Sequence, residues 1–353
     1  MPYVRPNIAA LAGYAPGEQP QGGKFIKLNT NENPYPASPA VTTAIEAALR
    51  NGLQRYPDPM ATAFRLRAAQ LFAAEVPGIT PDWILCGNGS DDLLTILTRT
   101  FICEGELLRL PYPSYILYRT LAEIQGARAE EVRFGADWSL NDDFSAKAAG
   151  LKLAFLPNPN SPSGTYIAPE RVLEIAERLP CPLVVDEAYV DFAATNCLSL
   201  VARSEKIIVT RTLSKSYALA GLRFGFAIAQ PHLIRELIKV KDSYNVDALS
   251  IAGATAAIDD QAWLRENRRK VLGTREKLTA GMKALGFDAV PSQANFVWCP
   301  HPKLPVKPLY EQLKTSGVLV RYMNYPGWSD GLRISVGTDD QNEACLGLLR
   351  GMV

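Results

Sequence analysis

The sequence predicts an α/β protein with a mostly parallel sheet in a large three-layer domain, followed by a smaller α+β domain. Between about residues 38 and 245, short apolar runs alternate with helical patterns. Such alternation is typical of a parallel sheet covered by helices on both faces. After residue 245 the order changes to a long helical stretch, three strand-like runs and a final helix. The length of 353 residues fits about two domains.

Three segments follow from this pattern. Residues 1–37 are rich in Pro, Gly and Asn and are expected to form an arm that packs with the small domain. Residues 38–245 form the large domain and residues 246–353 the small C-terminal domain. Within the large domain, Ser38 is expected to cap a helix that has Pro39 in its first turn and ends before Gly52.

The remaining elements are placed by period and by flanking turn residues. The strands expected in the large domain are 83–86, 106–110, 127–134, 151–156, 182–186, 206–210 and 224–229, with helices at 90–101, 114–125 and 169–179. The small domain is expected to contain a helix at 259–286, strands at 295–299, 317–323 and 331–337, and a helix at 339–353.

Composition and charge exclude several classes of function. The hydrophobic content of 47% and charged content of 21% are those of a globular protein. A net charge of +1 argues against nucleic acid or an anionic membrane as a partner. No apolar run approaches the ~18 residues of a membrane-spanning helix, and the Pro- and Gly-broken start does not resemble a secretory signal.

Cysteine and histidine usage narrows the chemistry further. The six cysteines are scattered and none forms a C-x-x-C pair, so they are expected to be buried free thiols in a reducing cytoplasm. Only two histidines, His232 and His301, are present, and both stand next to proline. Catalysis based on histidine is therefore not expected, and no metal site is predicted.

The loop "RTLSKSYALAGLRFG" (211–225) places Lys215 among hydroxyl groups and Arg223 eight residues later, beside glycines. One interpretation is an ordinary polar turn between two core elements. The other is a reactive amine with an anion site around it, because Thr212, Ser214 and Arg223 supply two hydroxyls and a guanidinium that can bind a phosphate. A neutral lysine amine is the nucleophile that attacks carbonyl groups.

The stretch "CGNGSDDLLTIL" places a glycine-rich turn between a strand and a helix. It is not a dinucleotide-binding fingerprint, since Asp92 replaces the third glycine, and no suitable histidine could serve Ser90 as a hydrolase nucleophile. The main-chain amides of Gly89, Ser90 and Asp91 at a helix N-terminus can hold a phosphate. An ordinary capped helix start is the alternative.

Two further loops offer charged groups. "PLVVDEAYVDF" ends a strand with Asp186 and has Tyr189 three residues later. A nucleotide-hydrolase interpretation fails because the chain has no phosphate-binding G-x-x-x-x-G-K-[ST] loop. Two interpretations of Asp186 remain: it caps a helix, or it supplies a fixed negative charge in a cleft. In "DGLRISVGT", Arg333 is either a solvated edge residue or a carboxylate clamp. Phosphate cradle, acid, phenol and lysine each follow a strand, in that order, which favours one shared site.

Taken together, the motifs resemble the fold-type I pyridoxal-phosphate enzymes and, within them, the histidinol-phosphate aminotransferases. The resemblance covers nearly the whole chain through "LNTNENPYP", "RYPDP", "GNGSDDLL", "PYPSYILY", "NPNSPSGT", "VVDEAYVDF", "RTLSKSYALAGLRFGF" and "GLRISVGT". The lysine motif and "DEAY" are typical of the broad class, whereas "NENPYP" and "LRISVGT" narrow it to the histidinol-phosphate branch.

The resemblance implies a pyridoxal 5'-phosphate cofactor and a role for each matching residue. Lys215 would form the imine with the cofactor, Asp186 would pair with its pyridine nitrogen, and Tyr189 would bind its ring hydroxyl. The phosphate would be held by Ser90, Asp91, Thr212, Ser214 and Arg223, with Tyr115 stacked on the ring and Tyr56 contributed by the other subunit. Arg333 would clamp the α-carboxylate of the amino donor, and Tyr14, Arg321 and Asn33 would lie near the rest of the substrate.

One position departs from the family pattern. The usual loop is N-N-P-T-G, and its second asparagine contacts the cofactor ring hydroxyl. This chain has Ser161 at that position, with Asn160 before it and Ser163 in place of the threonine. Either Ser161 makes the contact or Asn160 reaches it through a shifted loop; we favour Asn160.

The implied reaction is amino transfer from glutamate to a phosphorylated keto substrate, giving histidinol phosphate, with Lys215 as covalent anchor and general acid–base. The resemblance further implies a cytoplasmic homodimer with shared active sites, the N-terminal arm packing against the partner. The alternatives are another enzyme on the same scaffold, an aromatic aminotransferase or a phosphothreonine decarboxylase, and a non-catalytic regulatory protein. The last should lack the lysine or the carboxylate clamp, and this chain has both.

Overall fold

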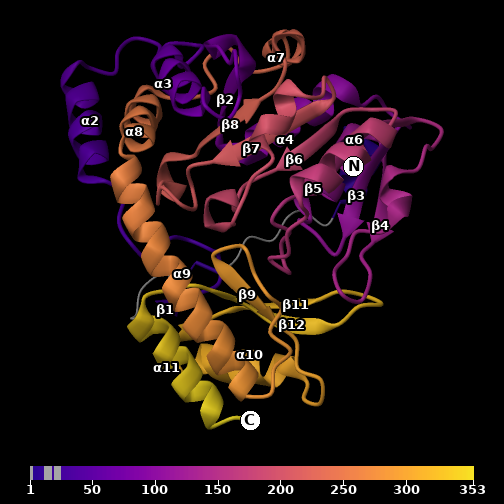
Figure 1. Cartoon of the computed structure of the whole chain (residues 1–353), viewed down its shortest axis with the longest axis vertical. Helices are drawn as coiled ribbons and strands as arrows, with labels where there is room; N and C mark the ends of the chain where they lie inside the picture. The colour runs from indigo at the N-terminus through magenta and orange to yellow at the C-terminus, as the bar shows by residue number, and fades with distance from the viewer. Residues whose placement is uncertain (1–2, 12–17, 20–24) are drawn as a thin grey trace.

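The computed structural model describes residues 3–11, 18–19 and 25–353, which form two stacked domains (Figure 1). The large domain is built on one seven-stranded sheet of order β2-β8-β7-β6-β5-β3-β4. Only β8 runs against its neighbours, so the predicted mostly parallel sheet is confirmed. The strands are β2 (Ile84–Asn88), β3 (Leu107–Tyr112), β4 (Arg128–Arg133), β5 (Leu151–Pro157), β6 (Leu183–Asp186), β7 (Ile207–Thr212) and β8 (Phe224–Ile228).

Helices cover both faces of this sheet (Figure 1). The first of them begins as expected: the Ser38 hydroxyl accepts from the Ala40 amide at 3.1 Å, and Gly52 follows in a left-handed conformation. The large-domain helices are α2 (Pro39–Arg50), α3 (Thr62–Phe72), α4 (Gly89–Phe101), α5 (Leu117–Gln125), α6 (Pro169–Arg178), α7 (Pro231–Ile238) and α8 (Ala248–Asp259).

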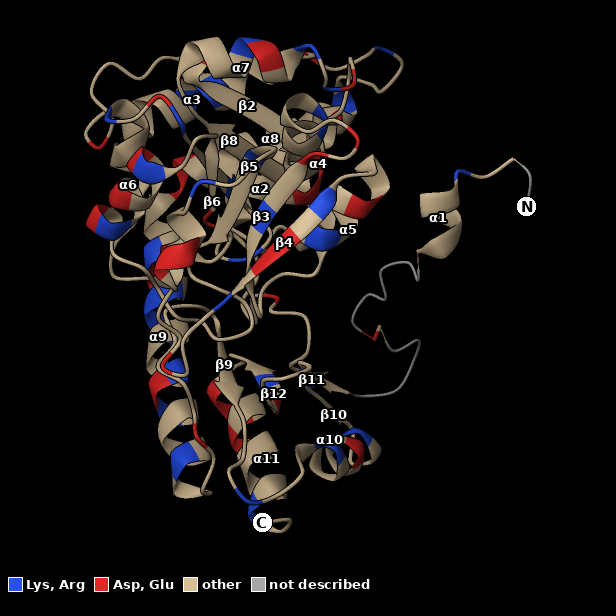
Figure 2. Ribbon diagram, turned by 90° about the vertical axis from the view of Figure 1, so that its right-hand side faces the viewer, with Lys and Arg blue, Asp and Glu red and all other residues tan. Residues whose placement is uncertain are grey.

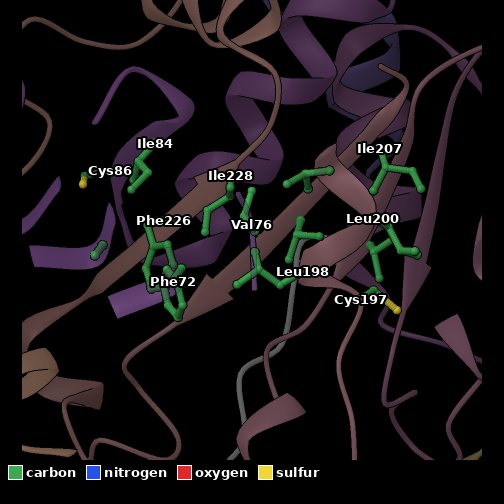
Figure 3. Close-up of a cluster of buried hydrophobic side chains, with 14 of the residues drawn as sticks. Phe72, Val76, Ile84, Cys86, Cys197, Leu198, Leu200, Ile207, Phe226 and Ile228 are labelled. Carbon is green, nitrogen blue, oxygen red and sulfur yellow. The ribbon is translucent and has the colours of Figure 1, made fainter. Parts of the chain in front are cut away.

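The central strands are apolar on both sides because each face carries its own core. Val184 and Val185 are consecutive in β6 yet belong to different apolar clusters, as successive side chains of a strand point to opposite faces. Figure 3 shows part of one cluster, in which side chains from α3, β2, β7 and β8 meet beside the segment 197–200. This double burial explains why the strands read as continuous apolar runs.

The small domain has a three-stranded antiparallel sheet of order β11-β12-β9. Its expected strand at 317–323 is in fact two strands that belong to different sheets. Val318 and Leu319 (β10) pair in parallel with Ile26 and Lys27 (β1) of the N-terminal arm, and the chain then turns into the other sheet. The elements are β9 (Phe296–Cys299), β10 (Val318–Leu319), β11 (Arg321–Asn324), β12 (Asp330–Ser335), α9 (Gln261–Ala284), α10 (Val306–Thr315) and α11 (Asp339–Arg350).

The predicted domain boundary near residue 245 comes too early for the packing. Val246 and, in α8, Ile251 and Ala254 belong to the large-domain core. A helix that is apolar on most of its surface needs cover on more than one side, and α8 packs against both α2 and α3. The chain instead crosses to the small domain along α9, whose Val271, Leu278 and Met282 lie in the small-domain core.

The arm is less irregular than predicted. It contains α1 (Pro6–Ala10), held to α5 by the Asn7 side chain, which donates to the Glu123 carbonyl at 2.8 Å. Its later part supplies β1 (Ile26–Lys27) and Leu28 to the small domain. Short 3₁₀ turns complete the fold at Pro81–Trp83, Asp142–Ser145, Val190–Phe192, Leu198–Ala202 and Ala220–Leu222.

Charged residues lie mainly on the outer helices, whereas the central strands are largely uncharged (Figure 2). Across the ranges that the structure describes, no helix is long and apolar enough to cross a membrane. All six cysteines are free; five are buried, but Cys103 is exposed, contrary to the prediction that all are buried.

Candidate active site

A cavity of about 410 Å³ lies at the carboxyl edge of the large sheet and faces the small domain. Loops that follow β2, β3, β5, β6 and β7 line one side, and β11 and β12 line the other. Ligands of open parallel sheets bind at this edge. A wider, more open hollow of about 830 Å³ lies elsewhere, beside Trp138 and Trp328, and contains none of the predicted site residues.

One end of the cavity is built to hold an anion. Ser90 and Asp91 stand in the first turn of α4, where main-chain amides point outward without helical partners. The Thr212 hydroxyl donates to Ser214 Oγ at 3.0 Å, and Arg223 Nη1 lies 3.5 Å from the same oxygen. Hydroxyls, amides and a guanidinium therefore converge here, as predicted from the sequence.

Gly225 allows this end of the cavity to close up. A Cβ atom at Gly225 would lie 2.7 Å from both the Gly89 carbonyl carbon and the Ser90 nitrogen. Distances that short are not tolerated, so β8 can approach the start of α4 only with glycine at this position. The glycine beside Arg223 is thus required by the geometry of the anion site.

Asp186 lies on the cavity wall at the end of β6 and is almost fully buried. Its carboxylate accepts from the Tyr118 hydroxyl at 2.7 Å and from the Ala188 amide at 3.2 Å. Burial raises the pKa of Asp186 to about 6, despite these hydrogen bonds. The surroundings of Asp186 therefore disfavour the ionised carboxylate unless a cation lies nearby.

Tyr118 was not predicted from the sequence. Its side chain is fully buried in α5, and burial raises the pKa of its hydroxyl well above the ordinary value. The hydroxyl therefore stays protonated and donates to Asp186. A tyrosine within "PYPSYILY" gives no local sign of this role, because its partner is 68 positions away.

Tyr189 is also fixed by a residue that the prediction missed. The Asn31 side-chain amide donates to the Tyr189 hydroxyl at 3.0 Å. Asn31 adopts a left-handed backbone conformation with φ of 56°, and its main-chain amide donates to Ser335 Oγ at 2.8 Å. Asparagine tolerates this conformation better than most residues, so the second asparagine of "LNTNENPYP" was the available signal.

Lys215 reaches into the cavity from the loop after β7. Its Nζ donates to the Thr30 carbonyl at 3.2 Å and lies 5.8 Å from the centre of the Tyr189 ring. The loop is held by the Asn33 side chain, which donates to the carbonyls of Lys215 and Ser216 at 3.1 and 2.9 Å. Asn33 is absent from the cavity lining, so the structure places it where it positions the lysine; its substrate contact stays a prediction.

Arg333, on β12, brings the small domain to the cavity. Its Nη1 donates to Ser161 Oγ at 3.0 Å and its Nη2 to the Asn29 carbonyl at 3.1 Å. Nε is buried and has no partner. A half-buried guanidinium with a buried, open donor is suited to a carboxylate or a phosphate.

The geometry does not support our preference for Asn160 over Ser161. The Asn160 amide donates to the Pro113 carbonyl at 3.2 Å and to Ser163 Oγ at 2.8 Å, and the residue is absent from the cavity lining. Ser161 lines the cavity. The Asn160 side chain thus holds the loop closed on Ser163, and the contact of either residue with the ring hydroxyl stays a prediction.

Arg321 and Arg333 form a cationic pair. They stand directly opposite each other on β11 and β12, and both line the cavity. Two guanidinium groups side by side on one wall of a cavity are suited to bind an anionic group. The pair therefore makes this end of the cavity a candidate second anion site.

The remaining predicted residues are placed as follows. Tyr115 lines the cavity and its hydroxyl donates to Asp91 Oδ1 at 3.2 Å. Tyr56 lies outside the cavity, 80% exposed and stacked on Tyr244 with ring centres 4.4 Å apart. Tyr14 lies outside the described residues. No cluster of three or more potential metal ligands occurs within the described ranges.

The fold and the site together define a class of enzyme. The family model "Aminotransferase class I and II" matches residues 23–348. The chain also superimposes over its full length, with a TM-score of 0.86 and 24% identity, on 99% of a histidinol-phosphate aminotransferase from Sinorhizobium meliloti that was solved in complex with pyridoxal-5'-phosphate. The chain therefore belongs to the class I and II aminotransferase family, and the predicted fold class and resemblance are confirmed.

Curated relatives identify the branch of that family. A histidinol-phosphate aminotransferase from Rhodopirellula baltica is 58% identical over 97% of this chain and 93% of its own length. A histidinol-phosphate aminotransferase 1 from a Nostoc species is 44% identical over 99% of this chain and 98% of its own. These relatives place the chain among the histidinol-phosphate aminotransferases.

Replacing Asp186 with Asn should stabilise the cofactor-free protein at neutral pH. The folded-state pKa of about 6 lies above the ordinary value of 3.8, so the stability that the protonated carboxyl provides is complete below the lower value and is lost as pH rises through the higher one. We expect Asp186→Asn to be more stable than wild type by up to about 3 kcal/mol near pH ~7.5, and the difference to shrink toward pH ~4.

Urea unfolding of both apoproteins across that pH range measures the difference. In the variant the amide oxygen can accept from the Ala188 amide while the NH2 group donates to the Tyr118 hydroxyl oxygen, so both contacts can be kept as the charge is removed. A wild-type protein that was equally or more stable at neutral pH would contradict the assignment of a strained buried carboxylate.

Adding a methyl group at Gly225 should disturb the anion end of the cavity. Because the new Cβ would meet the backbone of Gly89 and Ser90 at 2.7 Å, we expect Gly225→Ala to lower the free energy of unfolding by about 1–3 kcal/mol. Gly221→Ala is the matched control, since a Cβ at Gly221 meets nothing within 4 Å. Thermal or urea unfolding checks both variants, and equal effects would refute the close-approach argument.

Proposed function

We propose that this chain binds pyridoxal 5'-phosphate and uses it to transfer an amino group between glutamate and the keto form of histidinol phosphate. The observation that carries the proposal is that one cavity brings together an anion cradle, a buried carboxylate, a lysine amine and an arginine pair. The names and identities of the curated relatives support the choice of substrate.

The residues present fit this cofactor. The α4 N-terminus with Thr212, Ser214 and Arg223 suits its dianionic phosphate. Asp186, buried and short of a cation, suits its pyridine nitrogen, and Tyr189 suits its ring hydroxyl. When bound, pyridoxal phosphate supplies an aldehyde that condenses with amines and a ring that accepts the electrons left when Cα loses a proton.

Lys215 is the residue that acts on the substrate. Its amine extends into the cavity between Thr30 and Tyr189, where it would hold the cofactor through its aldehyde and move the proton at the substrate Cα. Asn33 fixes the backbone from which the lysine extends. This restricts the positions that the amine can take, so that it stays near the proton at the substrate Cα.

Asp186 and Tyr118 set the charge beneath the cofactor. A carboxylate whose pKa is raised by burial regains its ordinary acidity beside a cation. With the cofactor bound, Asp186 would hold a proton on its pyridine nitrogen, and the Tyr118 hydroxyl would keep the carboxylate oriented.

Arg333 and Arg321 bind the substrates. The planar guanidinium of Arg333, with its unpartnered Nε, suits the α-carboxylate of glutamate. Histidinol phosphate has a phosphate ester where glutamate has that carboxylate, so an arginine pair serves both substrates in turn. The tyrosines Tyr322 and Tyr325 extend the wall beside the pair and leave an aromatic surface for an imidazole ring.

The same proposal includes a cytoplasmic homodimer. Tyr56 is large, 80% exposed and remote from the cavity of its own chain, as expected of a side chain that reaches the phosphate of the partner's site. Apolar area for an interface is supplied by the exposed Tyr244, which stacks on Tyr56, and by the exposed Leu49 and Leu53, which lie close to Tyr56 in the sequence.

Half-reactions of the purified holoenzyme test this function. We expect the yellow absorbance to be lost at least about tenfold faster with histidinol phosphate than with phenylalanine or phosphothreonine at equal concentration. Only histidinol phosphate combines an imidazole ring with a phosphate ester at the position of the α-carboxylate, and one well-placed charged hydrogen bond contributes about 1.4 kcal/mol or more. Borohydride reduction should attach the cofactor to Lys215. A colourless protein would reject the cofactor, and faster conversion of phenylalanine or phosphothreonine would reject the substrate.

Lys215→Ala is the control for the chemistry. The variant keeps the anion cradle and Asp186, so it should bind the cofactor but fail to transfer the amino group. Normal turnover by Lys215→Ala would contradict the role of this lysine.

Removing the Ser161 hydroxyl should weaken binding of the amino donor. Ser161 Oγ holds Arg333 Nη1 at 3.0 Å, so we expect Ser161→Ala to raise the KM for glutamate about threefold to tenfold through the lost hydrogen bond. Steady-state kinetics measure the change, and Ser161→Thr, which keeps the hydroxyl, is the matched variant. A normal KM for Ser161→Ala would show that the contact does not position the arginine.

A further inference from the structure

The hairpin that carries the arginine pair reaches across the boundary between the domains (Figure 1). Arg321 and Arg333 stand at its base, and its turn, residues 325–329, lies at the other end. Residues 321–325, which run from the base to the start of the turn, all line the cavity. Any movement of the turn therefore moves the wall in which the two arginines are set.

The large domain holds this turn through main-chain contacts. Arg133, the last residue of β4, donates from Nη1 to the Gly327 carbonyl at 2.9 Å. Tyr112, the last residue of β3, donates from its hydroxyl to the Pro326 carbonyl at 3.3 Å. Arg133 also lies 5.5 Å above the Tyr112 ring, so the two donors support each other.

Glycine is favoured at the point of contact, mainly by its left-handed backbone conformation. Gly327 has a φ of 70°, and a Cβ atom there would lie 2.7 Å from Arg133 Nη1. The turn is thus shaped so that the guanidinium can lie directly on it.

Aromatic rings complete the contact between the domains. Trp138 of the large domain packs on Trp328 of the turn with ring centres 4.8 Å apart. Tyr325 meets the ring of Tyr112 edge-on at 6.0 Å. Trp138 is 8% exposed and belongs to a small apolar cluster with Phe134 and Trp298, so the ring that receives Trp328 is itself firmly held.

We propose that Arg133 and Trp138 are positioning residues that dock the turn 325–329 on the large domain and thereby hold Arg321 and Arg333 at the distance that substrate anions require. This inference rests on the proposed function, because it assigns the docking contact to that site. Neither residue touches the cavity. Their effect passes through the hairpin, which is stiffened by its paired strands and by the Tyr322–Asp330 hydrogen bond of 3.3 Å.

The contact predicts an effect on substrate affinity and not on cofactor binding. In the holoenzyme, Arg133→Ala and Trp328→Leu should each raise the KM for glutamate about fivefold to tenfold, with kcat and cofactor absorbance changed less than about twofold. Trp328→Leu removes no charge, so its effect cannot come from weaker attraction of the anionic substrate. The double variant should resemble the worse single variant, since both changes release one turn.

Two control variants separate the effect of losing the docking contact from the effect of losing a positive charge. Arg119→Ala removes a cation of the same domain that is paired with Glu131 at 2.9 Å and does not contact the turn; its KM should stay within about twofold of wild type, where surface ion pairs contribute little. Arg133→Lys keeps the charge but loses the planar donor, and should recover only part of the affinity.

The rate of amide hydrogen exchange across residues 321–335 reports on the docking contact independently of enzyme activity. We expect faster exchange in this segment for Arg133→Ala and Trp328→Leu, and unchanged exchange for Arg119→Ala. Unchanged exchange and an unchanged KM in both docking variants would overturn the inference. A wild-type enzyme that failed to use glutamate would reject the proposed function instead, and the exchange measurement would still decide whether the docking contact holds the hairpin.

Discussion

The site depends on one constraint: the carboxyl ends of parallel strands lie at a single edge of the sheet. Residues 90, 186 and 215 are far apart along the chain, yet each follows a strand that ends at that edge. The fold thereby brings an anion cradle, an acid and an amine to one cavity, and no separate contact between each pair is needed to do so. The small domain then has only to close the open side, which it does with one hairpin.

Two features at this edge are unfavourable to the cofactor-free protein. Asp186 is buried with a raised pKa. Arg333 Nε is buried without a partner. The charge of Asp186 is opposite to that of the protonated cofactor ring, and the charge of Arg333 is opposite to that of the substrate anion. Binding would therefore relieve both costs. Strain of this kind concentrates where a ligand is expected, and the apolar clusters of the two domains supply the stability that offsets it.

The two domains share the proposed substrate site more closely than the proposed cofactor site. The anion cradle, Asp186 and Lys215 all come from the large domain, whereas the arginine pair comes from the small one. Ser161 and the docked turn 325–329 are the points where the domains meet around that pair. Cofactor binding can therefore be robust to small domain movements, while substrate affinity depends on the position of one hairpin.

Local pattern determined the strands, the order of the functional loops, and the residues Lys215, Asp186, Tyr189 and Arg223. Each of these signals lies within a few residues of a strand end, so it survives in the sequence alone. Tertiary structure decided the partners: Tyr118 under Asp186, Asn31 on Tyr189, Ser161 and not Asn160 at the cavity, and the division of 317–323 between two sheets. A buried polar group must find a hydrogen bond wherever the packing places one, and the three side-chain pairs named here lie 68, 158 and 172 positions apart.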